Sequence, residues 1–93
     1  MLTRIKVNGK EYPCRITMGA IVRFKRLTGL DIKDIKPDDI ENYLAFLWCC
    51  IVSACNADKE EFTIPLEDFM DHLDPDQLTQ WTEGLAEDQE KKS

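Results

Sequence analysis

Histidine and glycine-rich loops, on which many catalytic and metal-binding sites depend, are nearly absent from this sequence. Its 93 residues include a single histidine, His72, and the glycines at 9, 19, 29 and 84 stand apart, so no glycine-rich loop could surround a phosphate. No two cysteines have the C-x2-C spacing of a zinc site, and His72 is distant from all of them in the sequence. We therefore assign no catalytic, cofactor-binding or metal-binding residue and expect a protein that is not an enzyme.

The longest apolar run, LAFLWCCIVSAC at residues 44–55, is too short to span a bilayer. The uncharged window around it extends only from Asn42 to Ala57, whereas a spanning helix needs about 18–20 apolar residues. The chain begins MLTRIKVNGK, which is charged and alternating and does not resemble a secretory signal. We expect a cytoplasmic protein without membrane contact.

Three of the four cysteines lie in that run. Cys49, Cys50 and Cys55 join Cys14, but a disulfide framework requires an oxidising compartment, which nothing in the sequence indicates. Cys49 and Cys50 are also neighbours, whose side chains diverge by about 100° on a helix. The prediction is four buried, reduced thiols without metal.

The charges are distributed unevenly along the chain. Residues 1–36 carry nine basic and three acidic side chains, whereas residues 37–93 carry three basic and fifteen acidic ones. The ordinary interpretation is two solvated regions that attract each other across the fold. The alternative is a polar molecule whose ends dock onto different partners, or onto each other in a homo-oligomer.

A β-hairpin is predicted at the start of the chain. Ile5 and Val7 share one face of a first strand, and Asn8-Gly9 follows as a strong hairpin turn because both residues tolerate positive φ. The return strand is expected over residues 11–16, with Pro13 facing a free edge.

Cap residues predict where the first two helices begin and end. Thr17 is a suitable N-cap and Gly29 a suitable left-handed end for a first helix. Asp38 and Glu41 have the spacing of a capping box before a second helix through residues 40–55. That helix is apolar almost all round, which predicts a buried central helix. Its apolar side chains are Tyr43, Leu44, Phe46, Leu47, Trp48, Ile51 and Val52.

Two amphipathic segments complete the predicted fold. One follows Pro65, and the other starts at Asp74, whose capping partner would be Gln77. The side chains expected to face the core from the first, third and fourth helices are Ala20, Ile21, Phe24, Leu27, Leu66, Phe69, Met70, Leu73, Leu78, Trp81 and Leu85. The fold class is α+β and mainly helical: an N-terminal β-hairpin followed by three to four helices around a buried central helix. We expect a single domain over residues 1–85 and a flexible polar tail over residues 86–93.

Three segments in this order resemble the small tail assembly chaperones of long-tailed bacteriophages and related gene-transfer particles. They are ITMGAIVRFKRLTGLDI, IENYLAFLWCCIVSACNA and IPLEDFMDHLDPDQLTQW, preceded by the basic hairpin. The resemblance covers roughly residues 3–82 and lies in the order of elements and the hydrophobic pattern. It implies a non-catalytic assembly factor, encoded by a phage or prophage and made in the cytoplasm of the bacterial host. Such a factor binds the helix-rich tape-measure protein and helps the tail tube assemble.

A chaperone of this kind needs apolar side chains that can cover an apolar stripe on its partner. The aromatic residues Trp48, Phe69 and Trp81 are the candidate partner contacts, although aromatic residues at helical spacing more often belong to a core.

Two other functions fit the sequence. The protein could be a structural or scaffolding part of a phage or mobile element. It could also bind nucleic acid weakly through its basic N-terminal half, using Lys6, Lys10, Arg23, Lys25 and Arg26. The net charge of −6 opposes tight or specific nucleic-acid binding.

Overall fold

A computed structural model describes residues 4–36 and 38–92, with side chains described as far as Gly84. Within these residues, a two-stranded hairpin precedes four α-helices and one short 3-10 helix. The elements are β1 (Arg4–Val7), β2 (Lys10–Pro13), α1 (Met18–Thr28), η1 (Ile32–Asp34), α2 (Ile40–Asp58), α3 (Leu66–His72) and α4 (Pro75–Lys92). The predicted α+β, mainly helical class is therefore confirmed.

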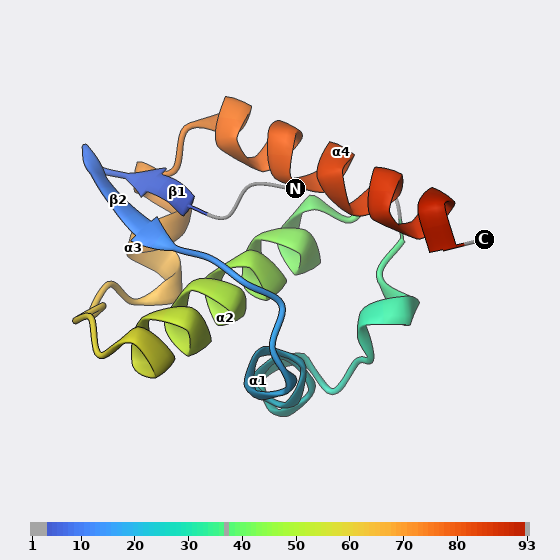
Figure 1. Cartoon of the computed structure of the whole chain (residues 1–93), viewed down its shortest axis with the longest axis horizontal. Helices are drawn as coiled ribbons and strands as arrows, with labels where there is room; N and C mark the ends of the chain where they lie inside the picture. Colours follow the sequence, from blue (N-terminus) through green and yellow to red (C-terminus); the bar gives the residue numbers. More distant parts are fainter. Residues whose placement is uncertain (1–3, 37, 93) are drawn as a thin grey trace.

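Helix α2 runs through the middle of the molecule, and the other elements surround it (Figure 1). Helix α1, seen end-on, lies on one side of α2, and α4 lies on the opposite side. The hairpin and α3 lie beside the C-terminal half of α2. Because α2 has neighbours on several sides, most of its apolar side chains are buried or half-buried, while Ile40 at its start is 61% exposed.

The hairpin forms as its turn sequence predicts. Asn8 and Gly9 both have positive φ, 50° and 84°, and Val7 pairs with Lys10 across the turn. The return strand was expected to reach residue 16 but ends at Pro13, which pairs with Arg4, the first described residue of β1. Ile5 and Val7 are fully buried, so the inward face of β1 belongs to the core.

The outer edge of β1 contacts the segment where α3 ends and α4 begins. Val7 forms an isolated antiparallel bridge with Leu73, and the backbone N–H of Lys6 donates to Oε1 of Gln77 at 3.1 Å. The Gln77 side chain was expected to serve the N-terminus of its own helix. It instead accepts from an edge-strand N–H for which the described residues offer no other partner.

Capping residues were located correctly for α1 and one position too early for α2. Thr17 Oγ1 accepts from Ala20 N at the start of α1, and Gly29 ends that helix with φ 79°. The N-cap of α2 is Asp39, which accepts from the backbone N–H of Asn42 at 3.3 Å. The same carboxylate also accepts from the Asn42 amide at 2.5 Å, a second contact that favours this register.

The core is built on α2 and on aromatic contacts between helices. Nine of the side chains of α2 are buried: Ala45, Phe46, Leu47, Cys49, Cys50, Ile51, Ser53, Ala54 and Cys55. Phe46 of α2 contacts Phe24 of α1, with ring centroids 5.4 Å apart, and Trp81 of α4 at 5.6 Å. Aromatic pairs in these tilted geometries contribute about 0.5–1.5 kcal/mol beyond area burial. They join three helices at one place.

The predicted apolar stripe of α1 is only partly in the core. Ala20 and Phe24 are fully buried and Ile21 is half-buried, but Leu27 is 48% exposed. The prediction that Leu27 faces the core is therefore wrong: Leu27 lies on the same side of α1 as Ala20, but in the last turn of the helix, where its side chain is largely uncovered.

Candidate partner-binding surface

The four thiols are buried and poorly suited to nucleophilic chemistry. Burial raises the pKa of Cys49 to about 11, and burial with nearby carboxylates raises that of Cys55 to about 11. A hydrogen bond with Cys14, followed by burial, also raises the pKa of Cys50. Since the thiolate is the reactive form, these groups are almost entirely protonated near neutral pH. All four cysteines are unpaired by disulfides.

The remaining chemical side chains are not assembled into a site in the described part of the chain. His72 is exposed on α3, and its Nδ1 lies 2.7 Å from the backbone oxygen of Asp68. Among the described residues, no three His, Cys, Asp or Glu side chains are arranged to hold a metal ion. The closest charged pair is the double contact from Arg15 to Asp58, at 2.6 and 3.1 Å.

The Arg15–Asp58 pair joins two segments of the fold. Arg15 lies in the segment between the hairpin and α1, and Asp58 is the last residue of α2. The Arg15 guanidinium lowers the pKa of the Asp58 carboxyl, mainly through the hydrogen bonds and also through its charge. Both side chains are substantially solvent-exposed, so the pair positions a connecting segment rather than a reacting group.

The three aromatic residues expected to contact a partner lie in or against the core. Phe69 and Trp81 are fully buried, and a partner cannot touch them while the fold is closed. Trp48 is half-buried, and its indole N–H donates to the carbonyl of Ile64 at 2.9 Å. That bond attaches the connector before α3 to α2. The structure does not bring the three side chains together on one accessible surface.

The accessible apolar side chains lie mainly on α1. Among residues with described side chains, the exposed large hydrophobics are Met18, Val22, Leu27 and Ile40, at 74%, 42%, 48% and 61%. Met18 and Val22 are four residues apart, and Lys25 and Arg26 continue the same face, since side chains three and four apart are neighbours on a helix. We call Met18, Val22, Lys25 and Arg26 the α1 outer face.

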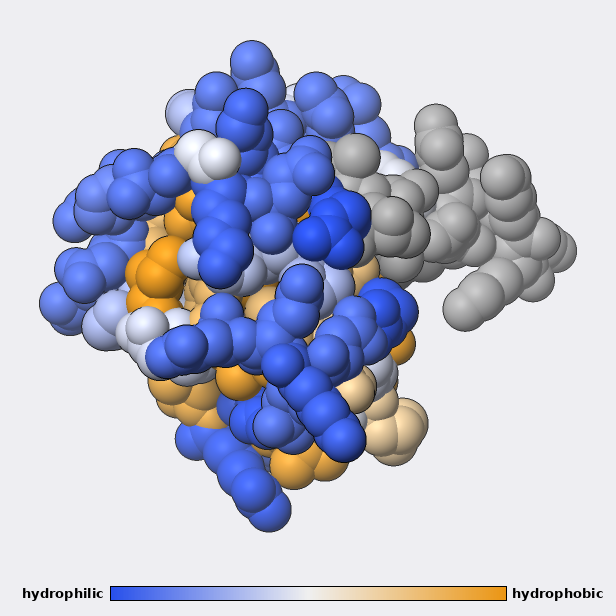
Figure 2. All heavy atoms as spheres, turned by 60° about the vertical axis from the view of Figure 1, so that its left-hand side comes forward, coloured by the Kyte–Doolittle hydropathy of each residue, from blue (hydrophilic) through white to orange (hydrophobic). Residues whose placement is uncertain are grey.

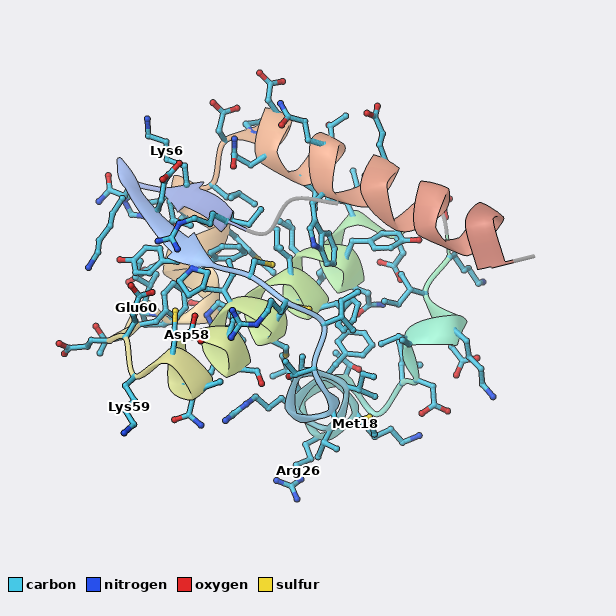
Figure 3. All side chains as sticks on the ribbon, in the orientation of Figure 1. Lys6, Met18, Arg26, Asp58, Lys59 and Glu60 are labelled. Atoms are coloured by element: carbon cyan, nitrogen blue, oxygen red, sulfur yellow. The ribbon has the colours of Figure 1, made fainter. Side chains whose placement is uncertain are left out.

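The α1 outer face points away from the rest of the molecule. In Figure 3, the side chains of Met18 and Arg26 extend from α1 on the side opposite to α2. Both Lys25 and Arg26 are exposed, and α1 contains no acidic residue. Lys25 forms one ion pair, with Asp31 at 3.4 Å. This surface therefore combines two accessible apolar side chains with two exposed cations, of which Arg26 takes part in none of the ion pairs found among the described residues.

The sequence contained the pattern for this surface, but only its cations, Lys25 and Arg26, were named as candidates, and Met18 and Val22 were not singled out. Met18 and Val22 fall on the side of α1 away from Ala20 and Phe24, where a solvated helix normally carries polar groups. Apolar residues at i and i+4 on the outer side of a helix are therefore informative. They were missed because the apolar stripe toward the core accounted for the helix without them.

Exposed carboxylates are concentrated away from α1, around α3 and the start of α4. Helix α3, the link after it and the start of α4 carry exposed carboxylates at Glu67, Asp68, Asp71, Asp74 and Asp76. The basic hairpin lies next to these helices, as the Lys6–Gln77 and Val7–Leu73 contacts require. The hairpin is thus next to the acidic helices within the same molecule, whereas α1 lies across α2 from α4 (Figure 1). Figure 2 shows the face that includes the hairpin as mostly hydrophilic, with apolar atoms in small separate areas.

A shallow hollow lies beside α1, at the C-terminal half of α2. It is lined by Arg23, Val52, Cys55, Asn56, Glu60 and Phe62. Arg23 Nε is buried and has no hydrogen-bond partner among the described residues. Because Glu60 brings a negative charge to the same lining, the hollow has no net preference for an anion.

Helix α2 is long and apolar enough, by length and composition, to cross a membrane. The core helix of a compact domain has the same properties, and the fold encloses nine of the side chains of α2.

A scan against protein-family models, a search of curated proteins and a search of solved structures each found no match to this chain.

Proposed function

We propose that the protein is a non-catalytic tail assembly chaperone of a long-tailed phage, prophage or gene-transfer particle. It acts by binding a helix-rich partner, the tape-measure protein. The observation that carries the proposal is the α1 outer face, where Met18 and Val22 are accessible at 74% and 42% beside two exposed cations. A small fold that keeps most apolar side chains inside and presents a few on one helix is suited to cover an apolar stripe on another helix.

Two further features support a binding role. The order of a basic hairpin, a first amphipathic helix, a buried helix and two shorter acidic segments is the order on which the resemblance to tail assembly chaperones rests. All four thiols, which are the strongest potential nucleophiles in the chain, are buried, and the pKa values of Cys49, Cys50 and Cys55 are raised.

The proposal is tested by co-expression with the long helix-rich tail protein encoded in the same gene cluster. We expect the partner's soluble fraction to rise and a complex to survive gel filtration. The control is the partner expressed alone at the same level. A partner that is equally soluble alone and elutes separately would remove the chaperone proposal and favour a structural or scaffolding role.

Weak nucleic-acid binding is the second candidate, favoured by the three cations of α1. The net charge of −6 works against phosphate binding at physiological salt. Gel-shift titration with duplex DNA at low and physiological salt separates this candidate from the chaperone proposal. Submicromolar binding that survives physiological salt would make nucleic acid the leading ligand.

A further inference from the structure

We propose that the α1 outer face is the docking site for an acidic amphipathic helix of another polypeptide. This inference rests on the proposed function for the identity of the natural partner, but the surface can be tested without that partner. The argument depends on the chemistry of four side chains: Met18, Val22, Lys25 and Arg26.

The apolar part of the face requires an apolar counterpart. Met18 and Val22 are one helical turn apart, so together they present a short strip along α1. The helix has 11 residues, which corresponds to a length of about 16 Å. A partner helix that lies along it would bury this strip with apolar side chains of its own spaced three and four residues apart.

The charged part of the face determines the sign of the charge that the partner must carry. Arg26 lies four residues after Val22 and is exposed, and none of the ion pairs found among the described residues includes it. Lys25 is 3.4 Å from Asp31, so one carboxylate already lies beside this face. The absence of acidic residues from α1 leaves the face cationic, and carboxylates flanking the partner's apolar stripe would complement it.

A second copy of the chain fits this surface less well. Its exposed acidic helices, α3 and the start of α4, supply the right charge. However, none of the exposed large hydrophobic residues among the described side chains lies on α3 or α4. A second copy would therefore satisfy Lys25 and Arg26 while leaving Met18 and Val22 against polar atoms. A different polypeptide with both an apolar stripe and acidic flanks satisfies all four side chains.

The test uses the full chain and a synthetic helical peptide with leucines at i, i+3, i+4 and i+7, flanked by glutamates. Binding is followed by fluorescence anisotropy of the labelled peptide and by backbone amide shifts of the protein. We expect affinity in the micromolar range, as for a small interface, and weaker binding as salt is raised. The largest amide shifts should fall in residues 18–28.

Matched variants separate a loss at this surface from the effect of removing exposed apolar area or changing charge elsewhere on the molecule. The double variant Met18→Ser, Val22→Ser should weaken peptide binding roughly tenfold, and Arg26→Glu should weaken it roughly fivefold. Ile40→Ser removes an equally exposed apolar side chain from α2, and Lys6→Glu reverses a charge on the hairpin. Both control variants should bind as the parent does. Circular dichroism and thermal melting confirm that each variant is folded.

Several outcomes overturn the inference. They are equal binding by the α1 variants and the parent, equal binding of a peptide whose glutamates are replaced by lysines, and amide shifts centred outside α1. Stronger binding to anionic phospholipid vesicles or to duplex DNA would assign the face to a different ligand. Concentration-dependent self-association that is lost in Arg26→Glu would assign it to a second copy.

The co-expression test separates the failure of this surface from the failure of the proposed function. If the tape-measure complex forms and the α1 variants retain it, the function stands and this surface is wrong. If the peptide binds and no tape-measure complex forms, the surface stands and the function is wrong.

Discussion

Helices α1 and α2 pack against each other and are both rich in apolar residues, yet the fold uses them differently. In α2, nine side chains are buried, and they occupy most of the circumference of the helix. In α1, only Ala20 and Phe24 are fully buried, and Met18, Val22 and Leu27 reach solvent. The difference teaches that hydrophobic content alone does not separate a residue that stabilises the fold from one available to a partner. What separates them is the number of neighbouring elements that cover each face.

The sharpest comparison applies the same substitution to each helix. Leu47→Ala in α2 removes a side chain with no exposure and should lower the free energy of unfolding by about 2–5 kcal/mol. Leu27→Ala in α1 removes one that is 48% exposed and should cost about 1 kcal/mol or less. Urea unfolding followed by circular dichroism measures both. Equal losses would show that α1 is enclosed as fully as α2.

Alkaline titration tests how well α2 is enclosed. Burial raises the pKa of Cys49 from its ordinary value to about 11, so the folded protein retains a proton that the unfolded chain releases. The free energy of unfolding is therefore unaffected by this group below about pH 9 and falls between about pH 9 and 11, by about 1.4 kcal/mol per unit. Cys49→Ala should reduce that slope, and urea unfolding at a series of pH values measures it. An unchanged slope would mean that Cys49 is accessible.

The contact between the two helices can be probed at Gly19. A Cβ at Gly19 would lie 2.8 Å from Ser53 Oγ, and Ser53 Oγ lies 2.5 Å from Thr17 Oγ1, the side chain that caps α1. Gly19→Ala should therefore destabilise the protein by about 1–2 kcal/mol through overpacking. Ser53→Ala removes the obstructing hydroxyl and costs about 1 kcal/mol by itself.

The double variant decides the interpretation of that contact. With Ser53→Ala in place, Gly19→Ala should become neutral or stabilising, since alanine is favoured over glycine in a helix by about 1 kcal/mol. Thermal melting of the four proteins gives the coupling free energy directly. Strictly additive effects would show that α1 and α2 do not approach each other closely at this point.

The smallest effect is expected at the Arg15–Asp58 pair, which joins the segment before α1 to the end of α2. The pKa of Asp58 is lowered in the folded protein, so its contribution is present above the ordinary carboxyl pKa and is lost as pH falls through the folded value. Arg15→Gln should leave the melting temperature at neutral pH nearly unchanged and weaken its dependence on pH below about 4. A large loss at neutral pH would assign this pair a far greater structural role.

The sequence predicted elements whose determinants are local. Asn8-Gly9, Thr17 and Gly29 act through their own backbone or the next turn, and each does what its residue type favours. The all-round apolar pattern likewise predicted α2 as the central helix. Contacts between distant segments could not be predicted, because nothing local encodes them. Gln77 bonds to Lys6 instead of capping α4, and Leu27 is exposed because the fold covers its side of α1 at Ala20 but not in the last turn.

The same reasoning explains what was missed on the surface. Aromatic residues attracted attention as partner contacts, but Phe69 and Trp81 are enclosed by elements that the sequence does not place. Met18 and Val22 were passed over because one apolar stripe of α1 seemed sufficient. Which of two apolar faces is covered depends on the crossing of α1 over α2, and that crossing is a property of the assembled fold.

The bond from Lys6 to Gln77 has a consequence for the newly made chain. The two residues are 71 positions apart, and the Val7–Leu73 bridge spans nearly as much of the chain. At a translation rate of about 5–20 residues per second, the ribosome needs about 3–13 s to add the residues between Pro13, where the hairpin ends, and Gln77. During that interval the hairpin is complete but its outer edge is unpaired, and a free strand edge can pair with other strands. The nascent chain therefore carries an open β-edge that is closed only when α3 and the start of α4 have emerged.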